Sequence, residues 1–265
     1  NMKQRIISAI VAIIICTPIV IIGKLPFFIG ASILGLIGFM ELMNAKEKEK
    51  KIPVVMKMIG VVLFVLIMMY EWGHKRLSYT LSDLLIFIIL LTIMPIVFYN
   101  KKKEYDISDA TFLFGSIVFL GVAFNNFVTI RMMDLYIFIY LLLITIMSDT
   151  FAYFVGRKFG KHKMCPSVSP NKTWEGFVGG LIISTIVSTL FYHFLVGEES
   201  ILLLILITIL LSIIGSLGDL VFSSIKRHFG IKDYGNIMPG HGGVLDRLDS
   251  ILFVILAFSY LSKFL

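Results

Sequence analysis

The chain has 265 residues, of which 58% are hydrophobic and 15% are charged. A soluble globular domain carries about a quarter charged residues, so this composition, with a mean hydropathy of +0.94, excludes an ordinary soluble protein. The net charge of +7 suits a surface that faces anionic lipid headgroups and requires no nucleic-acid partner. We therefore expect the lipid bilayer to be the main solvent of this chain.

Long apolar runs recur along the whole sequence. A helix needs about 20 mostly apolar residues to cross a bilayer, and open strands cannot cross because lipid leaves their edge hydrogen bonds unsatisfied. We predict an all-α, polytopic integral membrane protein with about nine transmembrane helices. The predicted spans are residues 5–22, 26–43, 54–72, 82–99, 110–129, 135–156, 174–196, 200–222 and 245–264.

The first span has an alternative interpretation as a signal peptide, because Lys3 and Arg5 precede its apolar core. No small-residue cleavage site is clear, however, and a second apolar run begins directly after Pro26. We therefore favour an uncleaved helical hairpin.

Lys and Arg are distributed unevenly between the two sides of this topology. Nineteen of the 24 fall at the N-terminus and in the loops near 44–57, 100–109, 157–173 and 223–247, and five fall on the other side. The positive-inside rule makes the first side cytoplasmic. We expect a multi-pass protein of the cell's inner (plasma) membrane whose active site faces the cytoplasm. We also expect the Lys/Glu run at 46–51 to be a solvated loop.

The sequence divides near residue 135 into two parts. In residues 1–134, about five spans carry charges only at their ends and in loops, as structural spans do. In residues 135–265, about four spans with cytoplasmic loops carry polar residues within them or at their ends. We expect the second part to be a catalytic transmembrane domain.

Carboxylates enter or cap three of these later spans, and an ionisable group near membrane depth suggests function. Asp219, Ser223 and Lys226 are spaced i, i+4 and i+7, so they share one helix face. Clustered carboxylates need cations, and oxygen ligands favour Mg²⁺ or Mn²⁺. The candidate metal ligands are Asp149, Asp219, Asp246 and Asp249.

The loops supply basic and flexible residues that suit phosphate. Ser169, Asn171 and Lys172 lie just before a predicted helix N-terminus, which is a natural phosphate site. Either Asn171 or Thr173 could also cap that helix. The glycines around His241 permit close backbone approach. Metal, phosphate and basic residues together indicate phosphoryl or nucleotidyl transfer.

Each signal also has a structural interpretation. In this interpretation, Lys226 and Arg227 simply anchor a span end, and Asp149 simply pairs with a neighbouring helix. The group formed by Asp246, Arg247 and Asp249 could be a surface capping cluster, and His241 could be a structural turn residue.

Four ordered motifs carry a family resemblance. Residues 148–153 (Ser-Asp-Thr-Phe-Ala-Tyr), 169–176 (Ser-Pro-Asn-Lys-Thr-Trp-Glu-Gly), 218–220 (Gly-Asp-Leu) and the 27-residue segment 223–249 resemble motifs of the phosphatidate cytidylyltransferases, also called CDP-diacylglycerol synthases. Met238 departs from the Leu, Ile or Phe of that pattern but keeps its size and apolarity. The first 134 residues match the family only in length and hydropathy.

The resemblance implies that CTP and phosphatidate react to give CDP-diacylglycerol and pyrophosphate in phospholipid biosynthesis. It also implies Mg²⁺, a second cation such as K⁺, and a homodimer in the bilayer. Asp219 and Asp246 are the first expected metal ligands, followed by Asp249 and Asp149. The expected catalytic residues are Asp219, Asp246, Asp249, Lys226, Arg227 and His241. The expected substrate-binding residues are Ser169, Asn171 and Lys172 for CTP phosphates, Lys226 and Arg227 for the lipid phosphate, and Arg247.

Two rival functions remain open from the sequence. CTP-dependent lipid kinases and CDP-archaeol synthases are similar polytopic enzymes, and they differ in the lipid product. A transporter also places carboxylates in broken helices, but the acidic residues here gather toward one face and no inverted repeat is apparent.

Overall fold

The structure, a computed structural model, describes residue 11 and residues 14–71, 80–99, 104–197, 200–237 and 242–264. The chain forms two compact units. Unit 1 comprises residues 1–129 and 229–246, and unit 2 comprises residues 130–228 and 247–265. The signature segment 223–249 is therefore shared between the two units.

The described elements are almost entirely helical. Those of the first half are α2 (Lys24–Lys46), α3 (Val54–Met68), α5 (Leu81–Ile93), α6 (Ile96–Tyr99) and α7 (Ile107–Met133). Those that follow are α8 (Leu135–Phe159), β1 (Lys163–Cys165), β2 (Ser169–Thr173), α9 (Trp174–Leu195), α10 (Ile201–His228), α11 (Leu245–Leu261) and the short 3₁₀ helix η2 (Ser262–Phe264).

Among the residues that the structure describes, six helical segments are long and apolar enough to cross a membrane: Lys24–Lys46, Leu81–Tyr99, Ile107–Met133, Leu135–Phe159, Trp174–Leu195 and Ile201–His228. The all-α, polytopic prediction is thereby confirmed, and each segment overlaps one predicted span. The remaining spans are less clear, since α3 and α11 are shorter and only residues 11 and 14–22 of the span 5–22 are described. The total of nine stays a prediction.

Local sequence explains where several helices begin and break. Thr80 and Asp83 form a capping box at the start of α5, and the Asp134 carboxylate accepts the backbone N–H of Tyr136 and Ile137 at 2.6 and 2.9 Å to start α8. Such caps satisfy donors that the first turn of a helix leaves unpaired. Pro95 lies between α5 and α6, where its missing N–H interrupts the helix.

Aromatic packing forms much of the core of unit 1. The rings of Phe39 in α2 and Phe64 in α3 stack with centroids 5.3 Å apart, and Phe124 of α7 meets Phe64 edge-on at 6.3 Å. A Cβ at Gly35 would lie 2.9 Å from the Phe64 ring, so the glycine allows α2 to approach these aromatic side chains closely.

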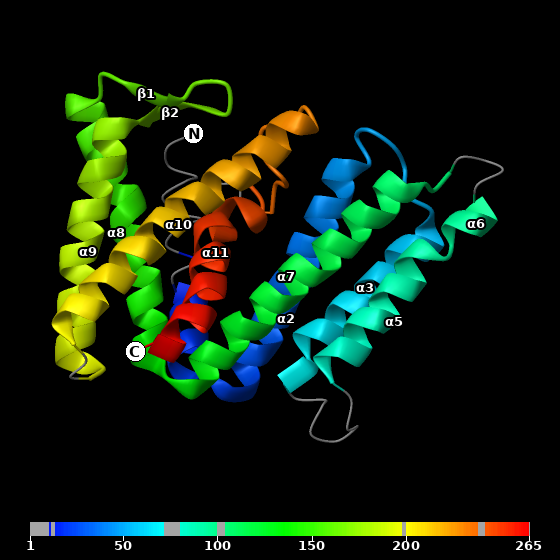
Figure 1. Ribbon diagram of the computed structural model, residues 1–265, viewed down its shortest axis with the longest axis horizontal. Helices are drawn as coiled ribbons and strands as arrows, with labels where there is room; N and C mark the ends of the chain where they lie inside the picture. The colour runs from blue at the N-terminus through cyan, green and yellow to red at the C-terminus, as the bar shows by residue number, and fades with distance from the viewer. Residues whose placement is uncertain are drawn as a thin grey trace. The chain divides into compact units, whose positions relative to one another are not determined.

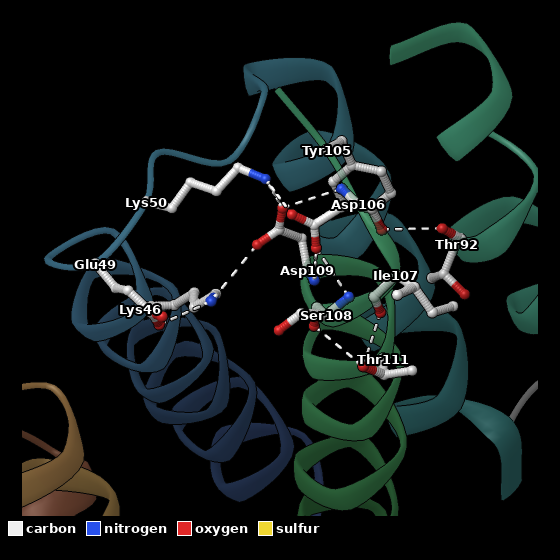
Figure 2. A network of polar contacts seen from close by, with 10 residues as sticks. All are labelled: Lys46, Glu49, Lys50, Thr92, Tyr105, Asp106, Ile107, Ser108, Asp109 and Thr111. Atoms are coloured by element: carbon white, nitrogen blue, oxygen red, sulfur yellow. Dashed lines mark hydrogen bonds and ion pairs between the residues drawn. The ribbon is translucent and has the colours of Figure 1, made fainter. Parts of the chain in front are cut away.

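A network of charged residues joins the C-terminal end of α2 to the start of α7 in unit 1 (Figure 2). The Lys50 ammonium lies 2.6 Å from Asp106 and 2.5 Å from Asp109, and Lys46 lies 3.5 Å from Asp109. Asp109 is 1% exposed and Lys46 is 4% exposed. The solvated-loop prediction for 46–51 was therefore wrong for Lys46, because this ion-pair network compensates its burial.

Small residues on one face of α9 let it pack closely against α8 in unit 2. Gly176, Gly180 and Ser184 recur every fourth residue and are buried. A Cβ on Gly180 would collide with the backbone oxygen of Ser148 in α8. Without a hydrophobic driving force between helices in lipid, such close backbone approach is a main source of attraction.

Hydroxyl pairs connect the same helices to α10. Ser184 and Ser212 lie 2.8 Å apart, and Tyr140 and Thr208 also lie 2.8 Å apart. Nearer the β1–β2 hairpin, Ser148 of α8 and Ser216 of α10 lie 3.3 Å apart. These interhelical bonds fix the register of α8 and α9 against α10 beside the predicted carboxylates.

The predicted loop 157–173 contains a short antiparallel hairpin, which lies at one end of α8 and α9 (Figure 1). Lys163 pairs with Thr173 and Cys165 with Ser169. Strands this short and polar lack the apolar alternation that would identify them in the sequence.

Candidate active site

A cavity of about 220 Å³ lies among α8, α10 and the hairpin of unit 2. Its lining includes Asp149 of α8, Asn171 and Lys172 of β2, and Ser216 and Asp219 of α10. Four of these five are predicted site residues. Segments separated by 70 residues in the sequence thus bring an amide, an ammonium group and two carboxylates to one opening.

An ion pair joins the two sides of the cavity. The Lys172 ammonium lies 2.6 Å from Asp219 Oδ2, and the two side chains are 27% and 24% exposed. Lys172 also donates to the Ser216 backbone oxygen at 3.4 Å, and the Ser223 hydroxyl donates to Asp219 Oδ1 at 3.2 Å. The ammonium is thus held at the cavity while remaining accessible to an anion.

Further charges act on this pair within unit 2. Asp249 in α11 is close enough to Asp219 and Asp149 for their charges to repel its own, while Lys226 attracts it. Asp149 is likewise repelled by Asp219 and attracted by Lys172 and by Arg247. Neighbouring carboxylates disfavour one another's charged form unless cations compensate them. The predicted residues whose charges interact in this way are Asp149, Asp219, Asp249, Lys172, Lys226 and Arg247.

The start of α9 explains how β2 presents its polar residues. Thr173 is the N-cap, and its hydroxyl accepts the Gly176 N–H at 3.2 Å. Of the two candidate caps in the sequence, Thr173 therefore takes this role, and Asn171 lines the cavity instead. Glu175 accepts the backbone N–H of Lys161 at 3.1 Å and pairs with His162 Nδ1 at 2.6 Å, which ties the base of the hairpin to α9.

Two other predicted residues lie on or near the hairpin. Arg227 donates from Nε to the Val168 backbone oxygen at 3.3 Å, so this guanidinium contacts the turn between β1 and β2. Ser169 is half-buried in β2 opposite Cys165. Among the residues that the structure describes, neither Arg227, Ser169 nor Lys226 belongs to the lining of the cavity.

Asp246 belongs to unit 1, where its carboxylate binds the signature loop. Asp246 Oδ2 accepts the backbone N–H groups of Tyr234 and Gly243, each at 2.8 Å. Gly242 has φ of +84°, a left-handed conformation that favours glycine. His241 and Met238, which the sequence also singled out, lie outside the described residues.

The carboxylates fit Mg²⁺ as part of a substrate complex. Within the described ranges, no three Asp, Glu, His or Cys side chains converge closely enough to hold a metal ion by themselves. Protein-bound Mg²⁺, however, commonly takes one or two carboxylates together with substrate phosphates and water. Asp219 and a neighbouring carboxylate, Asp149 or Asp249, would supply such a pair.

The predicted site residues leave out Ser216 and Tyr153, which both line the cavity. Tyr153 lies four residues after Asp149, so helical spacing alone already placed it on the face of that carboxylate. Ser216 lies three residues before Asp219, and the same spacing could have identified it.

Comparison with known proteins finds one family over nearly the full chain. Residues 3–265 match the model of the cytidylyltransferase family. The chain is 40% identical to the phosphatidate cytidylyltransferase of Staphylococcus haemolyticus, over 96% of each chain. It is 38% identical to the proteins of the same name from Staphylococcus aureus, over 96% of each chain, and Bacillus subtilis, over 96% of this chain and 95% of the relative. The chain therefore belongs to the cytidylyltransferase family.

Proposed function

We propose that this protein transfers the cytidylyl group of CTP to phosphatidate, giving CDP-diacylglycerol and pyrophosphate. The observation that carries the proposal is the cavity in which Lys172 and Asp219 pair at 2.6 Å beside Asp149 and Asn171. Relatives at 38–40% identity bear the name of this activity. The apolar helices suit a lipid substrate whose acyl chains stay in the bilayer.

The proposed reaction is an in-line displacement at phosphorus. A phosphate oxygen of phosphatidate attacks the α-phosphorus of CTP, the bond to the β-phosphate oxygen breaks, and pyrophosphate leaves. Both reacting groups are anionic, so catalysis depends mainly on positioning and charge neutralisation. A phosphate monoester is largely dianionic near pH 7, so the attacking oxygen requires no dedicated general base.

The basic residues have distinct proposed roles. Lys172 and Asn171 bind the CTP phosphates from the cavity side. Ser169, which lies on the same strand, also binds the CTP phosphates. Lys226 and Arg227, at the end of α10, bind the lipid phosphate, and Arg247 supports substrate binding. His241 binds phosphate or positions the signature loop.

Mg²⁺ is the proposed cofactor, and when bound it would neutralise charge on the phosphates of CTP. Its proposed ligands are Asp219 and Asp246, with Asp249 and Asp149 next; a second cation such as K⁺ belongs to the same proposal. A phosphate that attracts Lys172 away from Asp219 would free that carboxylate for the metal. Chelation of Mg²⁺ is therefore expected to abolish turnover.

The cellular setting follows from charge and composition. We place the protein in the inner (plasma) membrane with the hairpin and cavity facing the cytoplasm, where CTP is available, since the basic residues gather on that side of the predicted topology. A homodimer is part of the proposal.

Two positions of radiolabel in CTP test the function. With purified protein, Mg²⁺ and phosphatidate in detergent micelles, label at the α-phosphate should enter the lipid product, and label at the γ-phosphate should leave as pyrophosphate. Label from the γ-phosphate in the lipid would instead identify a CTP-dependent lipid kinase. A folded sample that labels no lipid, across several lipid phosphates and with K⁺ present, would contradict both enzymes.

A further inference from the structure

A buried carboxylate in unit 1 lies outside every motif of the sequence. Glu41 lies in α2 and is 5% exposed. A buried carboxylate is strongly unfavourable unless its oxygens are bonded. The partners of Glu41 therefore indicate why the residue is there.

Both oxygens of Glu41 bind the start of α11. Oε1 accepts the backbone N–H of Val244 and Oε2 accepts that of Leu245, each at 2.9 Å. The first N–H groups of a helix have no partner within the helix, and a negative charge near them is favourable. Val244, directly before α11, has no side-chain oxygen to cap them. A residue more than 200 positions earlier in the chain supplies the acceptor instead.

Two glycines of the signature segment accommodate this contact. A Cβ on Gly235 would lie 2.5 Å from Glu41 Oε1, and a Cβ on Gly243 would collide with the same carboxylate. The Asp246 carboxylate binds the N–H groups of Gly243 and Tyr234. Glu41 and Asp246 therefore hold the same loop together, and Asp246 itself lies in the first turn that Glu41 caps.

We propose that Glu41 is a positioning residue of the active site, which fixes the first turn of α11 and thereby the direction of the Asp246 carboxylate. This assigns a role in the reaction to α2, in the half of the chain that carries no motif. The proposal rests on the proposed function only where it connects Asp246 to cytidylyl transfer; the capping itself is testable separately.

The first test is amide hydrogen exchange on the peptide that covers residues 242–250. Glu41→Gln keeps the size of the side chain but presents an NH₂ group to one of the two N–H donors, and Glu41→Ala removes both acceptors. Exchange should rise in Glu41→Gln and rise further in Glu41→Ala. Asp109→Asn is the control, because Asp109 is also a buried carboxylate but belongs to the separate polar network of unit 1 (Figure 2). If this peptide exchanges as slowly in Glu41→Gln as in the unchanged protein, the proposal is wrong.

The second test separates positioning from loss of folded protein. In Glu41→Gln, we expect kcat per folded molecule to fall roughly 10- to 100-fold, as a misplacement of about 1 Å can cause, with KM for CTP little changed. Glu41→Asp, which keeps the charge, should recover part of this loss, and Asp109→Asn should keep the original kcat. Full kcat in Glu41→Gln, or an equal loss in Asp109→Asn, would refute a specific role for Glu41. If the unchanged protein forms no CDP-lipid, the proposed function fails while hydrogen exchange still decides the capping role.

Discussion

At the scale of single residues, the site depends on compensation between opposite charges. Lys172 pairs with Asp219 at 2.6 Å, and the charges of Asp149 and Asp219 repel that of Asp249. If a phosphate and a cation entered together, the phosphate would neutralise the ammonium group and the cation would neutralise the carboxylates. Such an arrangement favours substrates that bring phosphates and divalent cations into the cavity as a unit.

Replacing Lys172 should weaken CTP binding in particular. A hydrogen bond to a charged group contributes about 1.5–3 kcal/mol, so Lys172→Met should raise the KM for CTP by roughly one to two orders of magnitude. The matched control is Lys163→Met, because Lys163 is an exposed lysine on the other strand of the same hairpin. Steady-state kinetics with varied CTP measures both variants, and equal effects of the two would refute the assigned role.

Sequence was sufficient to find the charged residues that line the cavity, but not the contacts that these residues make. Helical spacing identified Asp219 with Ser223, which are indeed hydrogen-bonded at 3.2 Å. The partnership of Lys172 with Asp219 joins a strand to a helix 47 positions away, and no local pattern encodes such a pair. Glu41 was missed for the same reason, because its partners follow more than 200 residues later.

At the scale of elements, small residues decide how closely the helices of unit 2 approach one another. Gly176 and Gly180 of α9 lie against the backbone of α8, and a Cβ on Gly176 would be 2.6 Å from the Ala152 oxygen. Asp149 lies on α8 between these two contacts. Close packing of α9 therefore helps to set the wall of the cavity.

Enlarging one of these glycines should therefore affect stability and activity together. Gly180→Ala forces a Cβ against the Ser148 backbone, and overpacking of this kind costs about 1–3 kcal/mol. The control is Gly115→Ala in α7, where a Cβ meets no neighbour within 4 Å and should stabilise the helix by roughly 0.5–1 kcal/mol. Apparent unfolding temperatures in detergent should move in opposite directions. An unfolding temperature for Gly180→Ala equal to that of the unchanged protein would show that α8 and α9 are not closely packed.

The network at the start of α7 makes a separate prediction about pH. Hydrogen bonding from Lys50 is the main cause that lowers the pKa of Asp106. Because the folded pKa lies below the unfolded value of about 3.8–3.9, this stabilisation is fully present above that value and is lost as pH falls through the folded pKa. Thermal unfolding should show Asp106→Asn to be less stable than the unchanged protein at pH 6, with a difference that shrinks below about pH 4. A difference independent of pH would exclude a charge-based role for Asp106.

At the scale of the whole molecule, hydropathy was the strongest signal in the sequence. It identified the helical, polytopic class and six of the segments that can span a membrane. It could not fix the number of spans, because α3 and α11 are short and α11 begins with charged residues. It also could not reveal that residues 229–246 belong to unit 1, since that grouping depends on contacts distant in sequence.

Membrane orientation can be measured at Cys165, which is a half-buried residue at the end of β1. If the hairpin faces the cytoplasm, a membrane-impermeant maleimide should label Cys165 in inverted vesicles and leave it unlabelled in intact cells. Cys165→Ser is the control, because it retains Cys16, which lies in the first apolar segment. Labelling of Cys165 in intact cells would place the hairpin on the outer side and contradict the proposed orientation.

The most direct test of the account is the turnover of Asp219→Asn, measured as CDP-diacylglycerol formed from CTP and phosphatidate with Mg²⁺ in excess. The substitution preserves size but removes the charge that pairs with Lys172 at 2.6 Å. We expect a loss of at least about 100-fold, with unchanged helical content and an unfolding temperature close to that of the original protein. Near-original turnover in this variant would show that the cavity between α8, α10 and the hairpin is not where the cytidylyl group is transferred.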